Sequence, residues 1–104
     1  MSLTLTIPAP CDWLNSNQRL HWAEKARRTR AWRDAAHMAV LSQHKGLAFT
    51  APVRIVVTIH KPRAGRYDAT NWAPTGKALI DGLVDSGLLE DDDNTRVIGP
   101  DMRA

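Results

Sequence analysis

One uninterrupted stretch, from His21 to His44, constrains the fold more than any other part of this sequence, because it contains neither glycine nor proline. It is rich in Ala, Arg, Lys and Glu, all of which are compatible with a helix. The polar side of such a helix carries Arg27, Arg30 and Asp34. The opposite side collects Trp22, Ala26, Trp32, Ala36, Ala39 and Val40. The sequence therefore predicts one long amphipathic helix that ends near Lys45–Gly46, since glycine often terminates helices.

Three segments have the composition of β-strands. Leu3–Ile7 alternates Leu and Ile with Thr, which is the pattern of a half-buried strand. Pro52–Pro62 is dominated by Val, Ile and Thr and is bounded by proline at both ends. Arg96–Ile98 has the start of a third such pattern. We therefore expect three short strands.

A second helix is predicted between the last two strands. Pro74 and Thr75 open it, because proline is tolerated in a first helical turn, and Gly87 ends it. Its buried face would be Leu79, Ile80, Leu83 and Val84. The element order is then β-α-β-α-β, which predicts a single α/β (α+β) domain over residues 1–104, with a small mixed sheet covered by helices on one face. So few elements make a thin core, and we expect a homodimer.

Charge is distributed unevenly. Residues 1–66 carry 11 Lys and Arg against 3 Asp and Glu, whereas residues 67–104 carry 3 against 8. A basic half of this kind indicates a polyanionic partner such as nucleic acid. No apolar run is long enough to span a membrane, and no signal peptide is visible. The lone Cys11 excludes an intrachain disulfide and a thiolate zinc cluster and suits a reducing cytoplasm.

The acidic half offers hard oxygen ligands. Mg²⁺ and Mn²⁺ bind carboxylate oxygens and complete their coordination with water and substrate phosphate. The candidates flank and include the second predicted helix: Asp68, Asp81, Asp85, Glu90, Asp91, Asp92 and Asp93. A helix that folds back on its strand would bring Asp68 toward Asp91 and Asp92. The alternative is that residues 90–93 form a solvated acidic turn.

Two further groups have both a functional and a structural interpretation. Lys77, Asp81 and Asp85 share one side of the second helix, where Lys77 either contacts a phosphate or forms a surface ion pair. The basic residues near the first helix would contact DNA phosphates: Arg19, Lys25, Arg27, Arg28, Arg30 and Arg33. Trp22 and Trp32 lie among them. We expect both in the core, although Trp can also stack on bases.

Three strings in this sequence resemble the RusA family of Holliday-junction resolvases. The first is Asp68-Ala69-Thr70-Asn71, the second runs over residues 77–83 as KALIDGL, and the third runs over residues 86–92 as SGLLEDD. The turn at residues 15–19, NSNQR, is similar to the family's entry segment. The resemblance covers residues 3–98, which is nearly the whole chain.

The resemblance implies a homodimer that binds four-way DNA junctions and nicks them with Mg²⁺ or Mn²⁺. Asp68 matches the first metal-binding aspartate of the family, Lys77 the catalytic lysine and Asp92 the distal catalytic aspartate. Asp91 matches a neighbouring acidic position. The implied catalytic set is thus Asp68, Asp91, Asp92 and Lys77, with Asp68, Asp91, Asp92 and Asn71 as metal ligands.

Departures from the family pattern leave two functions open. Thr70 stands where the family has a second aspartate, so Asn71 or Asp91 would have to supply that metal ligand. The family also continues into another closing strand after the region matching residues 95–98, so we expect a trimmed C-terminus, as in a prophage remnant. The first function is a junction endonuclease of phage or prophage origin in DNA recombination and repair. The alternative is a catalytically impaired, structure-selective DNA-binding protein on the same fold.

Overall fold

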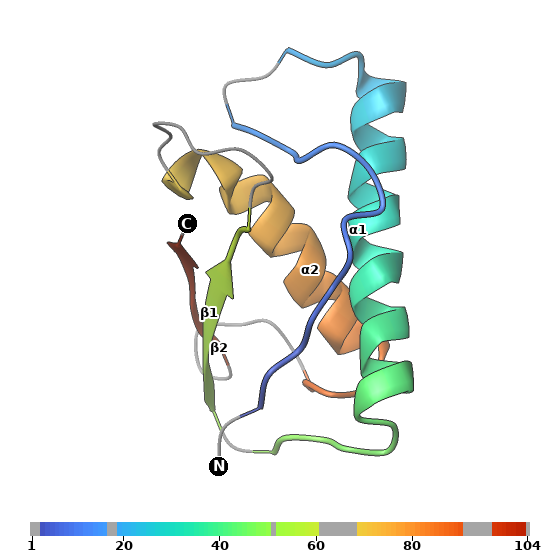
Figure 1. Cartoon of the computed structure of the whole chain (residues 1–104), viewed down its shortest axis with the longest axis vertical. Helices are drawn as coiled ribbons and strands as arrows, with labels where there is room; N and C mark the ends of the chain where they lie inside the picture. Colours follow the sequence, from blue (N-terminus) through green and yellow to red (C-terminus); the bar gives the residue numbers. More distant parts are fainter. Residues whose placement is uncertain (1–2, 17–18, 51, 61–68, 91–96, 104) are drawn as a thin grey trace.

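The computed structural model describes residues 3–16, 19–50, 52–60, 69–90 and 97–103. Within these residues the elements are α1 (Trp22–Gln43), β1 (Val53–Thr58), the 3₁₀ helix η1 (Ala69–Trp72), α2 (Ala73–Asp85) and β2 (Val97–Arg103). The two strands form a parallel sheet, and α2 lies between this sheet and α1 (Figure 1). The result is a small mixed α/β domain, as the sequence predicts.

Helix α1 matches its predicted extent. The imidazole Nδ1 of His21 accepts a hydrogen bond from the Ala23 amide (3.2 Å) and so caps the first turn. The helix ends at Gln43, and Gly46 follows with a positive φ of 83°. Glycine adopts that left-handed conformation without the steric penalty that a Cβ imposes. The local signals at both ends therefore suffice to set the length of α1.

The buried side of α1 is shorter than its sequence indicates. Trp32, Ala36, Ala39 and Val40 are buried, as expected. The prediction that Trp22 and Ala26 join them is wrong, because Trp22 is 76% exposed and Ala26 is exposed too. The reason is the path of α2, which meets the second half of α1 and diverges from the first half (Figure 1). Helical periodicity predicts which face of α1 is buried, but it does not predict how much of that face α2 covers.

Helices α1 and α2 approach most closely at Gly82. A Cβ built on Gly82 would lie 2.1 Å from the carbonyl oxygen of Arg33 and 2.7 Å from the Cβ of Ala36. The small residues at this crossing let the two backbones come together. Next to it the expected apolar face of α2 packs inward, with Leu79, Ile80 and Leu83 buried and Val84 half-buried. Helix α2 ends at Asp85, just before Gly87, as predicted.

The strand expected over Leu3–Ile7 is absent from the described residues. The alternation is real, because Leu3, Leu5 and Ile7 pack against the core while the threonines between them are exposed. The backbone, however, bonds to α1 side chains. The Gln43 amide accepts from the Thr6 N–H (3.1 Å) and donates to the Thr6 carbonyl (2.7 Å). These contacts satisfy polar groups that a neighbouring strand would otherwise satisfy.

The sheet consists of β1 and β2, joined through α2 as a parallel crossover. Val53 pairs with Val97 at one end and Thr58 with Arg103 at the other. Arg54 on β1 also donates to the Asp101 carboxylate of β2 (2.6 Å). The strands predicted within residues 52–62 and at residues 96–98 are therefore confirmed, and the second is longer than its start indicates.

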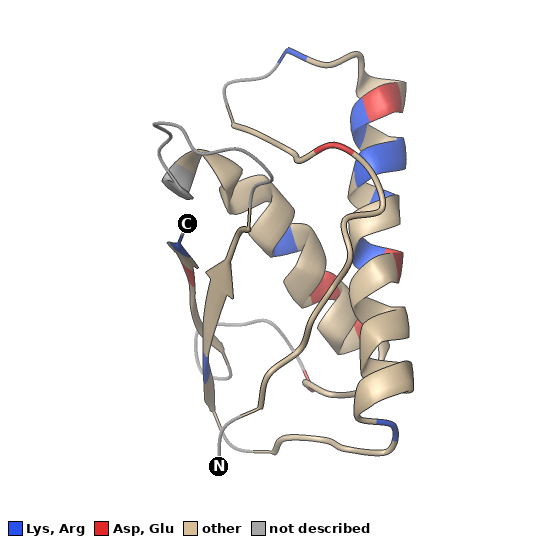
Figure 2. Ribbon diagram, viewed as in Figure 1, with Lys and Arg blue, Asp and Glu red and all other residues tan. Residues whose placement is uncertain are grey.

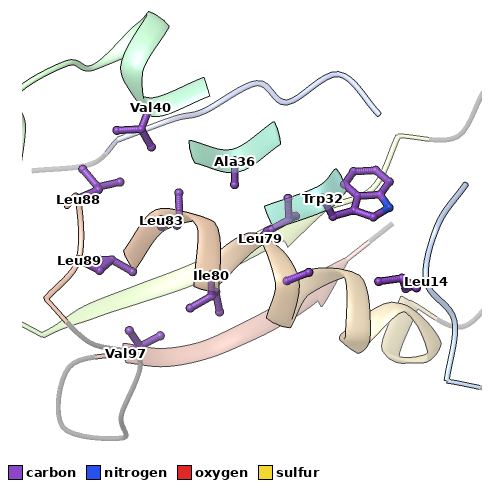
Figure 3. Packing of buried hydrophobic residues seen from close by; sticks show 11 residues of the cluster. Leu14, Trp32, Ala36, Val40, Leu79, Ile80, Leu83, Leu88, Leu89 and Val97 are labelled. Atoms are coloured by element: carbon purple, nitrogen blue, oxygen red, sulfur yellow. The ribbon is translucent and has the colours of Figure 1, made fainter. Parts of the chain in front are cut away.

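The hydrophobic core fills the space between α1, α2 and the sheet (Figure 3). Its buried members come from both helices, from the segment after α2, from the N-terminal segment and from β2. They are Leu14, Trp32, Ala36, Val40, Ala78, Leu79, Ile80, Leu83, Leu88, Leu89 and Val97. Trp13 stacks on Trp32 with ring centroids 4.6 Å apart. Among the described helices, none is long and apolar enough to cross a membrane.

Candidate functional site

Three of the predicted catalytic carboxylates, Asp68, Asp91 and Asp92, lie outside the described residues. The residues that border them, Ala69 and Glu90, belong to the segments at opposite ends of α2. Thirteen helical residues span about 20 Å. Within the described ranges, no three His, Cys, Asp or Glu side chains form a group that could hold a metal ion. Of the predicted metal ligands, only Asn71 falls inside the described structure.

The N-terminal end of α2 brings together segments that are distant in sequence. The Ser16 amide donates to the carbonyl oxygen of Asn71 (2.7 Å), so the predicted entry turn lies directly beside η1. A small depression lies at this junction. Its lining comes from the entry turn, from α1 and from the first turn of α2: Leu14, Asn15, Ser16, Leu20, Lys25 and Pro74. Lys25, a predicted DNA contact, therefore adjoins the segment that carries the family-like motif.

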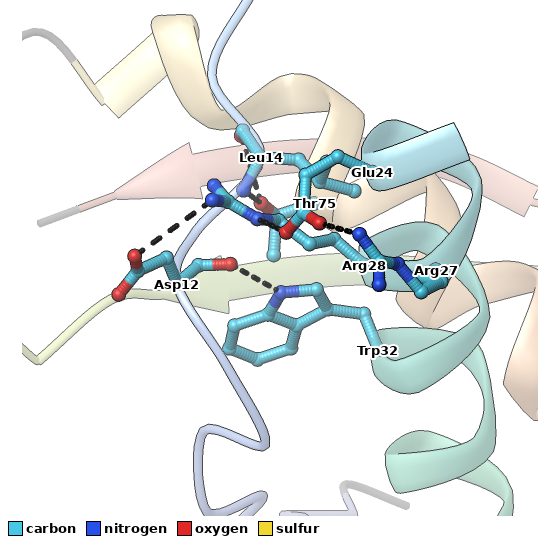
Figure 4. Close-up of polar contacts among 7 residues, drawn as sticks. All are labelled: Asp12, Leu14, Glu24, Arg27, Arg28, Trp32 and Thr75. Atoms are coloured by element: carbon cyan, nitrogen blue, oxygen red, sulfur yellow. Dashed lines mark hydrogen bonds and ion pairs between the residues drawn. The ribbon is translucent and has the colours of Figure 1, made fainter. Parts of the chain in front are cut away.

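A buried threonine fixes this junction. Thr75 is fully buried, and its hydroxyl donates to the Leu14 carbonyl and accepts from the Leu14 amide, both at 2.8 Å (Figure 4). The hydroxyl thus satisfies both backbone groups of Leu14, which is itself buried. Sequence reasoning assigned Thr75 only to the opening of α2. A Pro-Thr pair signals a helix start, but nothing in it reveals a partner 61 residues away.

Thr75→Val tests the importance of this contact. Valine has nearly the same shape but leaves the Leu14 amide and carbonyl unpaired in the interior, and each such group costs about 1–3 kcal/mol. We expect the free energy of unfolding to fall by about 2–4 kcal/mol, measured by urea denaturation with tryptophan fluorescence. Thr29→Val is the matched control, because in the described part of the chain the Thr29 hydroxyl bonds to the Lys25 carbonyl of its own helix. Equal losses in the two variants would contradict the assigned role of Thr75.

Lys77, the predicted catalytic lysine, is exposed on α2. Its ammonium lies 3.3 Å from the Asp81 carboxylate one turn later, so the predicted surface ion pair is present. Exposed pairs of this kind contribute little to stability, typically about 0–1 kcal/mol. Lys77 lies one turn beyond Pro74, outside the lining of the depression. The side chain is thus near the site without being buried in it.

Most basic residues of α1 lie in its first half (Figure 2), and their contacts divide them into two groups. Arg28 and Arg33 reach beyond their own helix: Arg28 donates to Glu24 (2.8 Å) and lies 3.9 Å from Asp12, and Arg33 donates to Asp85 at 2.5 and 2.7 Å. Only 18% of the Arg28 side chain and 39% of the Arg33 side chain are exposed. These two guanidinium groups connect α1 to the N-terminal segment and to α2.

The remaining basic side chains point to solvent. Arg27 pairs with Glu24 and Arg30 with Asp34 along α1, yet 75% and 71% of these arginine side chains are exposed. Arg19 and Lys25 are exposed as well, and within the described structure neither has an ion-pair partner. These residues, Arg19, Lys25, Arg27 and Arg30, form the exposed basic surface at the start of α1. Their charges are available to phosphates.

Arginine side chains lower the pKa of two carboxylates, Glu24 on α1 and Asp85 on α2. Hydrogen bonding from Arg28 holds the pKa of Glu24 below its ordinary value, although partial burial opposes this (Figure 4). Hydrogen bonding from Arg33 in the same way lowers the pKa of Asp85, and the Asp85 contact raises the pKa of Arg33. Both lowered pKa values favour the ionised carboxylate, and the Arg33–Asp85 pair joins α1 to α2, whereas the Arg28–Glu24 pair lies within α1.

The Arg33–Asp85 pair predicts a pH dependence of stability. Because the pKa of Asp85 is lower in the folded state, its contribution is complete above the ordinary aspartate pKa of about 3.9 and disappears as the pH falls through the lower folded-state value. We expect Asp85→Asn to destabilise the chain at neutral pH and this difference from the parent to shrink as the pH falls below the ordinary aspartate pKa. Urea denaturation across this range measures the difference. Asp34→Asn, which removes a pair confined to α1, is expected to have the smaller effect; an equal or larger effect would contradict the link between helices.

Comparisons of this chain with protein-family models, with curated proteins and with solved structures give no match.

Proposed function

We propose that this chain is a RusA-like endonuclease that binds branched DNA and hydrolyses phosphodiester bonds with Mg²⁺ or Mn²⁺, in DNA recombination or repair. The single observation that carries the proposal is the junction at the start of α2. There the entry turn (Asn15, Ser16), the segment carrying Asn71, and Lys25 of the basic helix come together. A nuclease needs cations that hold phosphates beside the group that cuts them.

The residues divide into two roles. Arg19, Lys25, Arg27 and Arg30 would contact the DNA backbone, because they are exposed and basic. Arg33 would orient α1, since its guanidinium group binds Asp85 of α2, and Arg28 would assist, since it lies 3.9 Å from Asp12 of the N-terminal segment. Lys77, exposed near the start of α2, would stabilise negative charge on the phosphate.

The metal would be held by Asp68, Asp91, Asp92 and Asn71. Carboxylate and amide oxygens are suitable ligands for Mg²⁺, and the ion would activate water and offset phosphate charge when bound. The backbone of Asn71 is held by the Ser16 amide, which donates to the Asn71 main-chain carbonyl, so the Asn71 side chain would be presented from a fixed position.

A homodimer would help to complete such a site. The residues bordering the carboxylates belong to the segments at opposite ends of α2, about 20 Å apart along the helix. Two copies can bring the start of α2 in one protomer toward the end of α2 in its partner.

A nicking assay tests this function. The purified chain is incubated with an end-labelled four-way junction and Mg²⁺ or Mn²⁺, and the products are separated on a denaturing gel. We expect nicks in the junction, few in a linear duplex of the same sequence, and none in EDTA. Cleavage that persists equally in EDTA would contradict the metal-dependent mechanism.

Thr70 supports the alternative function, a structure-selective DNA-binding protein with impaired catalysis. Threonine cannot supply the negative charge of the aspartate that the family pattern has at this position. Junction binding in a gel-shift assay without any nicked product, in either metal, would favour this alternative over the endonuclease.

A further inference from the structure

Trp22 is the most exposed large apolar side chain in the described structure. It is 76% accessible at the first position of α1. The other three tryptophans pack together: Trp13 stacks on Trp32 and has its ring centroid 6.3 Å from that of Trp72. The imidazole of His21 lies 5.5 Å from the Trp22 indole and is tilted by 33° to it. Trp22 thus presents its indole to solvent instead of packing with the other tryptophans.

Trp22 stands at one end of a shallow depression along α1. Trp22, Ala26, Thr29 and Arg33 follow one another at helical spacing and form its floor. Lys25 and Arg30 line it as well, from the two sides of this row. Cationic groups thus flank an aromatic ring on a rigid helix.

Three cations line the depression, and two of them pair with carboxylates that do not line it: Arg30 with Asp34, and Arg33 with Asp85. Residues 22–33 contain five Lys and Arg, and Glu24 is the single acidic residue. Glu24 is bound by Arg27 and Arg28, on another side of α1 from the depression. The lining of the depression thus carries cations and no carboxylate around an apolar centre, and Lys25 has no ion-pair partner in the described structure. Surfaces that bind single-stranded nucleic acid combine the same two features.

We propose that this depression binds an unpaired nucleotide of DNA, whose base stacks on Trp22 while Lys25 and Arg30 contact its flanking phosphates. The proposal deepens the proposed function and rests on it, since it names the part of a branched substrate that α1 recognises. Unpaired bases expose the π-face that an indole needs, whereas bases within a duplex are already stacked.

Charge complementarity favours DNA over a second copy of this chain as the occupant. Two copies joined through this face would bring Lys25 and Arg30 of each protomer close to the same residues of its partner, and like charges in contact are unfavourable. A phosphate backbone is negatively charged, so its contact with Lys25 and Arg30 is favourable. Duplex contact alone would use the cations but would leave Trp22 without a partner.

The test compares two single strands of equal length: a fluorescein-labelled oligothymidylate and an oligomer with the same number of phosphates but abasic sugars. Fluorescence anisotropy measures both affinities for the parent chain, Trp22→Ala, Trp22→Phe and Met38→Ala. Met38 is the matched control, because it is 62% exposed on α1 and does not line the depression. Binding of an intact four-way junction is measured with the same proteins.

We expect the parent chain to prefer oligothymidylate over the abasic strand by about tenfold, which is typical of one stacked base. Trp22→Ala should abolish this preference, Trp22→Phe should retain most of it, and Met38→Ala should leave it unchanged. The salt dependence of Trp22→Ala should equal that of the parent chain, because no phosphate contact is removed.

Three results would overturn the inference while leaving the proposed function standing. The first is an affinity of Trp22→Ala for oligothymidylate equal to that of the parent chain, and the second is an equal loss of affinity for both strands. The third is a change of oligomeric state of Trp22→Ala in light scattering, which would assign this face to a second copy of the chain. If the parent chain binds neither the strands nor the junction, the proposed function fails together with the inference.

Discussion

Replacing Gly82 with alanine is expected to lower the free energy of unfolding by about 3 kcal/mol. The added methyl would lie 2.1 Å from the Arg33 carbonyl oxygen, and that oxygen belongs to a helix backbone that cannot move alone. The two helices would have to separate and open the core. A domain of this size has a total stability of only about 5–15 kcal/mol, so this one methyl removes a large part of it. Urea denaturation of the variant measures the loss.

The sign of this effect is diagnostic. At an exposed helix position, Gly→Ala stabilises by about 1 kcal/mol, so destabilisation at Gly82 can only come from the close crossing. Gly46→Ala is the control for a substitution without a steric clash. It introduces backbone strain at a positive φ, but no atom lies within 4 Å of the new methyl. The double variant with Ala36→Gly relieves the 2.7 Å contact but not the one with Arg33. Full rescue by Ala36→Gly would show that the backbone contact is not the cause.

Asp92→Asn is expected to reduce junction cleavage by about a hundredfold or more while leaving junction binding intact. The resemblance assigns Asp92 to metal binding, and a bound metal ion supplies several kcal/mol of charge stabilisation, at about 1.4 kcal/mol per tenfold in rate. The exposed basic surface at the start of α1 is unchanged in the variant, so affinity for phosphates should persist. Nicking and gel-shift assays on one junction separate the two effects.

Asp93→Asn is the matched control, because it changes charge identically at the next residue, to which the resemblance assigns no role. We expect it to cleave like the parent chain. A similar loss in both variants would mean that the acidic run acts through its net charge. Full activity in Asp92→Asn would remove Asp92 from the metal site.

The helices were predictable because their signals are local. Helix α1 begins and ends where its sequence indicates, and α2 has its proline at the start and its apolar face inward. Helix propensity, capping and 3.6-residue periodicity all act over a few neighbouring residues. The same holds for β1, whose inward and outward residues alternate as a half-buried strand requires.

The errors share one cause, which is contact between distant segments. Leu3–Ile7 has the face pattern of a strand, but its backbone partners are side chains of α1 some 37 residues later. Trp22 has the spacing of a core residue, but α2 diverges before reaching it. Periodicity specifies which face of an element is apolar. It does not specify which element covers that face, or over what length.

For the candidate site, the sequence by itself determined the chemistry of the parts: a basic helix, an acidic segment around α2 and a motif-bearing stretch that begins at Asp68. Only the tertiary structure decided how the arginines divide, because Arg28 and Arg33 find carboxylates on other segments while Arg27 and Arg30 remain exposed. It also placed Ser16 against Asn71 and left Trp22 in solvent. Charge and periodicity are properties of neighbouring residues, whereas exposure and pairing depend on which distant segments pack together.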